Sequence, residues 1–268
     1  MSPPLISFIV TCHNEPEAFL HACLESIRAL PLAEGEAEIL VVDDGSSSPP
    51  TSPPGVRLIR QEQAGLSVAR NTGIAHAHGS YVQFVDADDA LIPSAYGAVI
   101  EHMRQGAADV VMFRMRTGGT VGPDRQECPK SPEYPNSPGS PDSPEYPNGA
   151  ELLLHRNLRA AAWGYAFRRE ILGDLRFHPG LLHEDELFTP QLFLRAGSVC
   201  ELAARAYFYR QHPGTITSAK SPEWIQKRLD DIHFVIMQLC SLENPLLERR
   251  VRQLTVDYLQ KAWTLTHS

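Results

Sequence analysis

The chain has 268 residues, of which 43% are hydrophobic and 21% charged, a composition that suits one large soluble domain or one domain with an appendage. Its formal net charge of −8 argues against a nucleic-acid binder, because such proteins carry a basic patch or stripe. The five cysteines are scattered, odd in number and without a Cys-x-x-Cys pair, which argues against a disulfide framework or structural zinc.

The first part of the chain alternates short apolar runs with amphipathic stretches. The runs are rich in β-branched residues and nearly continuous, a pattern typical of strands that are buried on both faces of a parallel sheet. Strands that alternate with helices indicate an α/β fold with a mostly parallel, Rossmann-like sheet flanked by helices. The predicted strands are 5–11, 38–42, 56–59, 81–85 and 109–113, and the predicted helices are 16–27, 64–75 and 93–104.

Three of the predicted strands end in polar clusters. These clusters are 11–15, 43–44 and 86–89. In doubly wound sheets, ligands bind beyond the carboxyl ends of the strands, so polar groups gathered at that edge indicate a binding site.

The strand at 81–85 runs directly into three carboxylates. Asp86 and Asp88 are two residues apart and point to the same side if the backbone is still extended there. Two like charges at this distance repel each other unless a cation lies beside them, and Mg²⁺ or Mn²⁺ is the natural occupant. The alternative is an acidic turn in which Asp89 caps the helix that begins near Pro93.

The segment 118–148 has a different composition. From Pro129 to Pro147, a proline falls at every third position, which matches the three residues per turn of a polyproline II helix. We interpret this segment as a low-complexity insertion that is solvated and poorly ordered. A semi-rigid flap over the site and a proline-rich docking ligand are the alternatives.

The second half of the chain is expected to continue with a helix at 149–158. An acidic block at 182–188 precedes apolar residues at helical spacing, which predicts a helix with carboxylates at its N-terminus. Two amphipathic helices are predicted within 223–268, and their apolar stripes are typical of core packing. A dimer seam and a peripheral membrane contact are the alternatives for these stripes. Gly73 and Gly79 are interpreted as packing and turn glycines.

Four blocks of this chain resemble, in order and spacing, the successive blocks of family-2 glycosyltransferases with the GT-A fold. The resemblance covers roughly residues 5–115. It implies a nucleotide-sugar-binding half at 1–117, the insertion at 118–148, an acceptor-side half that carries the catalytic base at 149–222, and C-terminal helices at 223–268. The four blocks are 7–11, 41–46, 65–74 and 84–89.

The same resemblance implies a role for each candidate residue. The Glu-Asp pair at 184–185 corresponds to the pair that carries the catalytic base, so Asp185 is the expected base and Glu184 its catalytic neighbour. Asp88 is expected to bind the metal with the support of Asp86, which is also a candidate contact for the ribose. The segment 208–217 resembles the loop near the diphosphate, where Arg210 and His212 are the polar candidates, His212 as a metal ligand. The expected donor contacts are Thr11, His13, Glu15 and Asp44 to base and ribose, and Arg70 to the phosphates.

These assignments predict a metal-dependent, inverting glycosyltransferase that uses Mn²⁺ or Mg²⁺ and a nucleotide-sugar donor. The implied acceptor is a glycan or a lipid-linked sugar, as in polysaccharide biosynthesis. A sugar-nucleotide nucleotidyltransferase is disfavoured, because 11–16 contains neither glycine nor lysine. A catalytically inactive sugar-nucleotide-binding module is the remaining alternative. With no basic leader and no long apolar run, the expected location is the cytoplasm, with the inner face of the membrane as the alternative.

Overall fold

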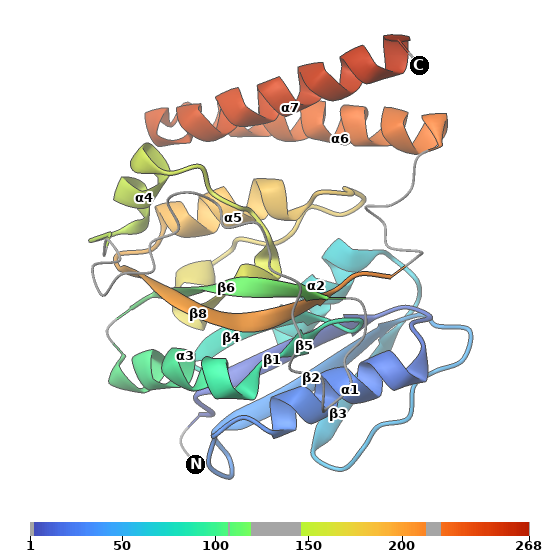
Figure 1. The fold of residues 1–268 in the computed structure, drawn as a ribbon, viewed down its shortest axis with the longest axis vertical. Coiled ribbons are helices and arrows are strands. Elements are labelled where there is room, and N and C mark those ends of the chain that lie inside the picture. The colour runs from blue at the N-terminus through green and yellow to red at the C-terminus, as the bar shows by residue number, and fades with distance from the viewer. Residues whose placement is uncertain (1–2, 107, 119–145, 213–220, 268) are drawn as a thin grey trace.

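The computed structural model describes residues 3–106, 108–118, 146–212 and 221–267. These residues form an eight-stranded sheet with the strand order β3-β2-β1-β4-β7-β6-β8-β5. Helices cover both faces of the sheet, and the last two helices form an outer layer beyond α4 and α5 (Figure 1). The predicted α/β architecture is therefore confirmed.

One half of the sheet is parallel and contains four of the five predicted strands; the fifth, 109–113, is the start of β6 in the other half. In this half, β1 lies between β2 and β4, and β3 pairs with the outer edge of β2. Thr11, near the end of β1, is level with Asp86 of β4, and Cys12 is level with Asp43 of β2. The register thus brings the polar strand ends to one edge of the sheet. The bounds are β1 (Ile6–Cys12), β2 (Ala37–Asp44), β3 (Val56–Gln61) and β4 (Tyr81–Asp86).

The other half of the sheet is mixed and was largely missed in the sequence. Three pairings, β4 with β7, β7 with β6 and β5 with β8, are antiparallel, whereas β6 and β8 run parallel. The interpretation of 208–217 as a loop is wrong at its start, because Phe208 lies within β8 and pairs with Ala90 and Arg116. The bounds are β5 (Ala90–Leu91), β6 (Val110–Gly118), β7 (Tyr165–Arg168) and β8 (Val199–Arg210).

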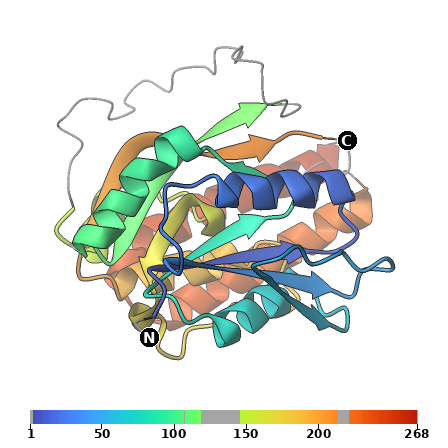
Figure 2. The same ribbon diagram turned by 90° about the horizontal axis from the view of Figure 1, so that it is seen from below.

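Two hydrophobic cores form because successive side chains of a strand point to opposite faces. In β1, Ile9 packs into one core, whereas Phe8 and Val10 pack into the other. The helices divide in the same way, and Figure 2 shows α1 and α3 together on the near face. The Phe8 side contains α1 (Glu17–Arg28) and α3 (Pro93–Gln105), and the Ile9 side contains α2 (Leu66–His76), α4 (Gly149–His155), α5 (Asp185–Leu194), α6 (Pro222–Ser241) and α7 (Glu248–His267).

The prediction of two C-terminal helices whose apolar stripes pack on the core is confirmed. Helices α6 and α7 bury residues of these stripes, including Leu229, Ile232 and Leu254. Several predicted boundaries differ by one or more residues, and helix α4 ends at His155 instead of reaching residue 158. The alternative in which Asp89 caps the helix near Pro93 is wrong, because Ile92 is the N-cap of α3. The described residues also contain short 3₁₀ segments, η1 (Ala162–Gly164), η2 (Arg169–Leu172) and η4 (Pro245–Leu247).

Most of the proline-rich segment lies outside the described residues, so its predicted polyproline II helix stays a prediction. Tyr146 is described, and it forms an isolated bridge with Val199 at the start of β8. Among the described helices, none combines the length and the apolar character that crossing a membrane requires.

We expect Gly73→Ala to destabilise the protein, because a Cβ at this position would lie 2.2 Å from Cγ2 of Ile9 where α2 packs on β1. Overpacking of this kind costs about 1–3 kcal/mol, against about 1 kcal/mol gained in helix propensity. Urea unfolding measures the difference. Gly164→Ala is the matched control, because its Cβ meets no atom within 4 Å. Equal stabilities of the two variants would contradict the close packing.

Candidate active site

A cleft of about 640 Å³ opens beyond the carboxyl ends of β1, β2 and β4. It contains ten of the predicted site residues, drawn from both halves of the chain. Arg210 is the predicted residue that does not line it. The predicted residues in the cleft wall are Thr11, His13, Glu15, Asp44, Arg70, Asp86, Asp88, Glu184, Asp185 and His212.

A buried arginine connects the two halves of the cleft. Arg70, on α2, donates through Nη2 to Oδ1 of Asp86 at 3.0 Å and through Nη1 to Oε1 of Glu184. Its guanidinium also lies 5.4 Å from the ring centre of Phe177 and 5.7 Å from that of Phe84. The charge of Arg70 is thus taken up by carboxylates of the protein, and its predicted contact with donor phosphates stays a prediction.

This arginine is held in its charged state. Burial by itself lowers the pKa of Arg70, but the carboxylates of Glu184 and Asp86 outweigh that effect and raise it. The Asp86 carboxyl is half-buried, with 28% of its side chain exposed, and desolvation raises its pKa against the opposing charge of Arg70. The positive charge of Arg70 therefore offsets the repulsion between the negative charge of Asp86 and those of Glu184 and Asp185 at the start of α5.

The two acidic residues at the start of α5 have different surroundings. Glu184 is 3% exposed and bonded to Arg70, whereas Asp185 lies half-buried in the cleft wall. Among the described residues, the Asp185 carboxylate accepts no hydrogen bond from another side chain. Burial raises the pKa of Asp185 to about 6 and that of Glu184 to about 8, against the lowering effect of Arg70. Asp185 is therefore the carboxylate of this pair that is available for proton transfer near neutral pH.

Asp88 and His212 meet on the other side of the cleft. The distance between Oδ2 of Asp88 and Nε2 of His212 is 2.9 Å. Two ligands that are bound side by side to one octahedral cation, with bonds of about 2.1 Å, also lie about 3 Å apart. The pair therefore fits as two ligands of a divalent cation. No group of three or more His, Cys, Asp or Glu side chains in the described part of the chain is arranged to hold a metal.

The loop that carries Asp88 is fastened to β8. Asp89 is almost fully buried, and its carboxylate accepts from the Tyr207 hydroxyl and from the Arg210 backbone N–H, both at 2.7 Å. Arg210 in turn donates through Nε to the carbonyl of Asp88 at 2.6 Å and stacks on Phe19. Arg210 is thus a support beneath the Asp88 loop, which explains why it does not line the cleft.

The loops after β1 and β2 are held together by His13 and Asp44. His13 donates from Nδ1 to the Asp44 carbonyl at 2.7 Å, so its Nε2 accepts from the Asn14 amide at 2.9 Å. The Asp44 carboxylate accepts from the backbone N–H groups of Ala64 and Gly65, both at 2.8 Å. Asp44 therefore positions the N-terminus of α2, which bears Arg70, in addition to facing the cleft.

Glu15 adds a further carboxylate to this wall, and it accepts a hydrogen bond from the backbone N–H of His13. Burial raises the pKa of Glu15, and the negative charge of Asp88 raises it further. The cleft thus concentrates carboxylates, which favours binding of a cation or of groups that donate hydrogen bonds.

Several cleft residues were missed in the sequence. Trp163, in η1, is 9% exposed and stacks on Tyr207 with ring centres 4.5 Å apart. A buried aromatic residue is not part of a recognisable sequence motif. Trp163 and Tyr207 come together only because of strands that were not predicted from the sequence. The missed residues in the wall are Cys12, Asn14, Pro16, Gln63, Gly65, Leu66, Ala69, Ala87, Trp163, Leu182, His183 and Tyr209.

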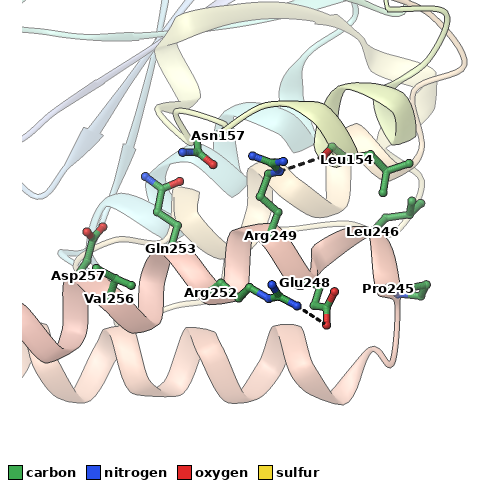
Figure 3. A pocket seen from close by; sticks show the side chains of 10 residues that line it. All are labelled: Leu154, Asn157, Pro245, Leu246, Glu248, Arg249, Arg252, Gln253, Val256 and Asp257. Atoms are coloured by element: carbon green, nitrogen blue, oxygen red, sulfur yellow. Dashed lines mark hydrogen bonds and ion pairs between the residues drawn. The ribbon is translucent and has the colours of Figure 1, made fainter.

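A second cavity of about 680 Å³ lies between α4, η4 and α7, away from the predicted site residues (Figure 3). Two arginine side chains that line this cavity form contacts within the protein. Arg249 donates to the Leu154 carbonyl at 2.9 Å, and Arg252 pairs with Glu248 at 3.1 Å. The first cleft is therefore the stronger candidate for an active site.

Comparison with known proteins identifies the family. The model of the family described as Glycosyl transferase family 2 matches residues 7–140, which is half of the chain. The chain belongs to glycosyl transferase family 2. Among its family-2 relatives, the uncharacterized glycosyltransferase EpsJ of Bacillus subtilis is 29% identical over 228 residues, which cover 80% of this chain and 63% of EpsJ. Glycosyltransferase GlyA of Streptococcus pneumoniae is 27% identical over 90% of this chain, which spans 35% of GlyA.

Solved structures share the family-2 fold. The crystal structure of S. aureus TarS 1–349 in complex with UDP-GlcNAc matches with a TM-score of 0.67 at 20% identity, over 97% of this chain and 72% of that one. The mannosyltransferase PcManGT from Pyrobaculum calidifontis, in complex with GDP-Man and Mn²⁺, matches with a TM-score of 0.59 at 15% identity, over 99% of this chain and 74% of that one. These similarities confirm the GT-A fold.

We expect Arg70→Met to lower the free energy of unfolding by about 3–5 kcal/mol near pH 8, because it leaves the buried Glu184 and the half-buried Asp86 without their cation. The loss should be smaller near pH 5.5. Without Arg70, the folded-state pKa of each carboxyl rises further above its unfolded value. Stability from such a group is fully present at low pH and is lost as pH rises through the folded-state pKa.

Urea unfolding at both pH values measures this change. Arg28→Gln, which removes an exposed pair with Glu25, is the control and should cost less than about 1 kcal/mol at either pH. A loss for Arg70→Met that is independent of pH would contradict the electrostatic role of this residue.

Proposed function

We propose that this chain transfers a sugar from a nucleoside diphosphate sugar to an acceptor hydroxyl with inversion at the anomeric carbon. The observation that carries the proposal is the cleft in which Asp88 and His212 line one part of the wall and Asp185 lines another. The complexes of TarS with UDP-GlcNAc and of PcManGT with GDP-Man and Mn²⁺ support a nucleotide-sugar donor and a divalent cation.

The proposed catalytic base is Asp185. Its raised pKa, about 6, leaves it ionised at neutral pH and still basic enough to accept the proton of the attacking hydroxyl. Glu184 is proposed as a positioning residue, because its bond to Arg70 fixes the start of α5 next to the base. A single base on the face opposite the leaving group gives inversion of configuration.

Asp88 and His212 are proposed to hold Mn²⁺ or Mg²⁺, with Asp86 as a support beside them. A bound divalent cation would neutralise the charge that grows on the leaving diphosphate. The remaining residues of the wall bind and orient the donor. Thr11, Glu15 and the loop that His13 and Asp44 hold together are the proposed contacts to base and ribose.

The acceptor is proposed to be a glycan or a lipid-linked sugar. The competing function is a nucleotide-sugar-binding module without catalysis. The environment of Asp185 disfavours that alternative, because a half-buried carboxylate with a raised pKa in a cleft is typical of a catalytic group.

We expect Asp185→Asn to lower turnover by about 10²–10⁴-fold while the KM for the donor stays nearly unchanged, since the amide cannot accept the proton. In the unmodified protein, kcat/KM should rise with pH and level off above the Asp185 pKa of about 6, because the base is protonated below it. Release of nucleoside diphosphate from a panel of nucleotide sugars, with Mn²⁺ and candidate acceptors, measures both effects.

Glu17→Gln is the matched control for Asp185→Asn, because it removes an exposed carboxylate outside the cleft. Its turnover should equal that of the unmodified protein. Donor binding without turnover by the unmodified protein would favour the binding module, and full activity of Asp185→Asn would refute the assignment of the base.

We expect His212→Ala to raise the Mn²⁺ concentration for half-maximal binding by about tenfold or more, because it removes one of two proposed ligands. Electron paramagnetic resonance of free Mn²⁺, in the presence of a nucleoside diphosphate, measures binding independently of activity. The exposed His21 supplies the control variant, His21→Ala. Identical Mn²⁺ titrations of the two variants would refute the ligand assignment.

A further inference from the structure

Three basic side chains from three different parts of the fold lie near one another, close in the chain or in space to Glu184 and Asp185. His183 lines the cleft just before α5, Arg228 lies on α6, and Lys261 lies on α7. Nε of Arg228 donates to Nε2 of His183 at 3.2 Å. Because arginine is always a donor, His183 accepts at Nε2 and carries its own proton on Nδ1. We call these three residues the basic cluster.

The members of the basic cluster are close enough to repel one another. Burial, together with the positive charges of Arg228 and Lys261, lowers the pKa of His183 to about 4. Burial likewise lowers the pKa of Lys261, and so does the charge of Arg228. Like charges gathered in a partly desolvated place cost free energy, and a bound anion would recover that cost.

The acidic groups near the basic cluster do not neutralise it. Asp231 faces His183, but its carboxylate is already bonded to Nζ of Lys227 at 3.0 and 3.1 Å and to the N–H of Leu182 at 2.9 Å. Asp257 raises the pKa of Lys261 without reaching ion-pair distance. In the part of the chain that the structure describes, neither Arg228 nor Lys261 forms an ion pair with a carboxylate.

Two other arginines of the same helices are paired with carboxylates of the described residues, unlike Arg228. Arg250 forms an ion pair with Glu186, and Arg252 pairs with Glu248. Both Arg228 and Lys261 are half-buried, so water screens them less than it screens an exposed lysine or arginine. The arrangement is that of an anion site at the acceptor side of the cleft.

We propose that Arg228 and Lys261, with His183 between them and the cleft, bind a phosphate or carboxylate group of the acceptor. The inference rests on the proposed function, in which Asp185 accepts the proton of the acceptor hydroxyl. His183 is two residues from Asp185, so an anionic group held at the basic cluster lies near the end of the acceptor that reacts. The guanidinium offers paired N–H donors that match either oxyanion, and Lys261 adds a compact positive charge. The acceptor is therefore an anionic glycan or a sugar phosphate and not a neutral sugar.

Isothermal titration of the full chain tests this inference. The probes are glycerol 3-phosphate, glucuronate and neutral glycerol, each added at constant ionic strength with EDTA present so that no metal site contributes. We expect one or both anions to bind, and glycerol not to bind. Arg228→Gln/Lys261→Gln should weaken anion binding about tenfold or more, and each single substitution should give an intermediate loss.

Arg252→Gln is the matched control, because it removes an exposed arginine that lies on α7 outside the basic cluster. Its anion affinity should equal that of the unmodified protein. Binding of glycerol 3-phosphate alone assigns the site to a phosphate, and binding of glucuronate alone assigns it to a carboxylate. No binding of either anion, or equal binding by the double variant, would overturn the inference.

A separate titration with UDP, and one with GDP, both in the presence of Mn²⁺, distinguishes this result from the proposed function. The double variant should bind the nucleotide as tightly as the unmodified protein does. Loss of anion binding with intact nucleotide binding supports the subsite. Failure of the unmodified protein to bind any nucleoside diphosphate would count against the proposed function and would leave the anion titration to be judged by itself.

Discussion

The guanidinium of Arg70 is the interaction on which the cleft depends. It donates hydrogen bonds to Asp86, at the end of β4, and to Glu184, which lies 114 residues after Arg70 in the sequence. These two carboxylates belong to different halves of the fold, and the repulsion between their negative charges would drive them apart without a cation between them. A single buried cation thus holds the end of the parallel sheet against the start of α5, and it sets the separation between the proposed metal ligands and the proposed base.

A second set of contacts fixes the Asp88 side of the same cleft. Asp89 is buried, and desolvation raises the pKa of its carboxyl to about 8. It accepts from Tyr207 and from the backbone of Arg210, while Arg210 donates to the Asp88 carbonyl. These bonds tie the loop after β4 to the end of β8, which is also the strand that delivers His212. The metal side and the base side are therefore both positioned by buried polar contacts that span long stretches of sequence.

Sequence patterns were sufficient to predict the parallel half of the fold and most of the polar residues that meet in one cleft. Strands buried on both faces, such as β1 and β2, appear as continuous apolar runs, and the edge to which they point collects the polar strand ends. In contrast, β8 mixes exposed and half-buried positions, including Glu201 and Arg205, and β5 is only two residues long. Neither strand has a periodicity that reveals it, so both were missed.

The roles of individual side chains were harder to predict than their presence. Arg70 and Arg210 were both expected at the phosphates, because positive charges near a diphosphate site suggest that role. In the structure, Arg70 bonds to the Glu184 carboxylate and Arg210 bonds to the Asp88 carbonyl. Both partners lie far away in the sequence. No sequence pattern revealed the basic cluster for the same reason, since His183, Arg228 and Lys261 come together only through the packing of α6 and α7 against the rest of the fold.

In the proposed mechanism, one cleft holds the diphosphate and the base on facing walls that Arg70 joins. A crystal structure with Mn²⁺ and the nucleoside diphosphate that a thermal-shift screen selects tests it most directly. We predict that the diphosphate lies beside Asp88 and His212, that the Asp185 carboxylate faces the open space next to it, and that Arg70 remains bonded to Asp86 and Glu184. A nucleotide bound elsewhere on the molecule, or an Arg70 that leaves its carboxylates to bind the phosphates, would contradict the account.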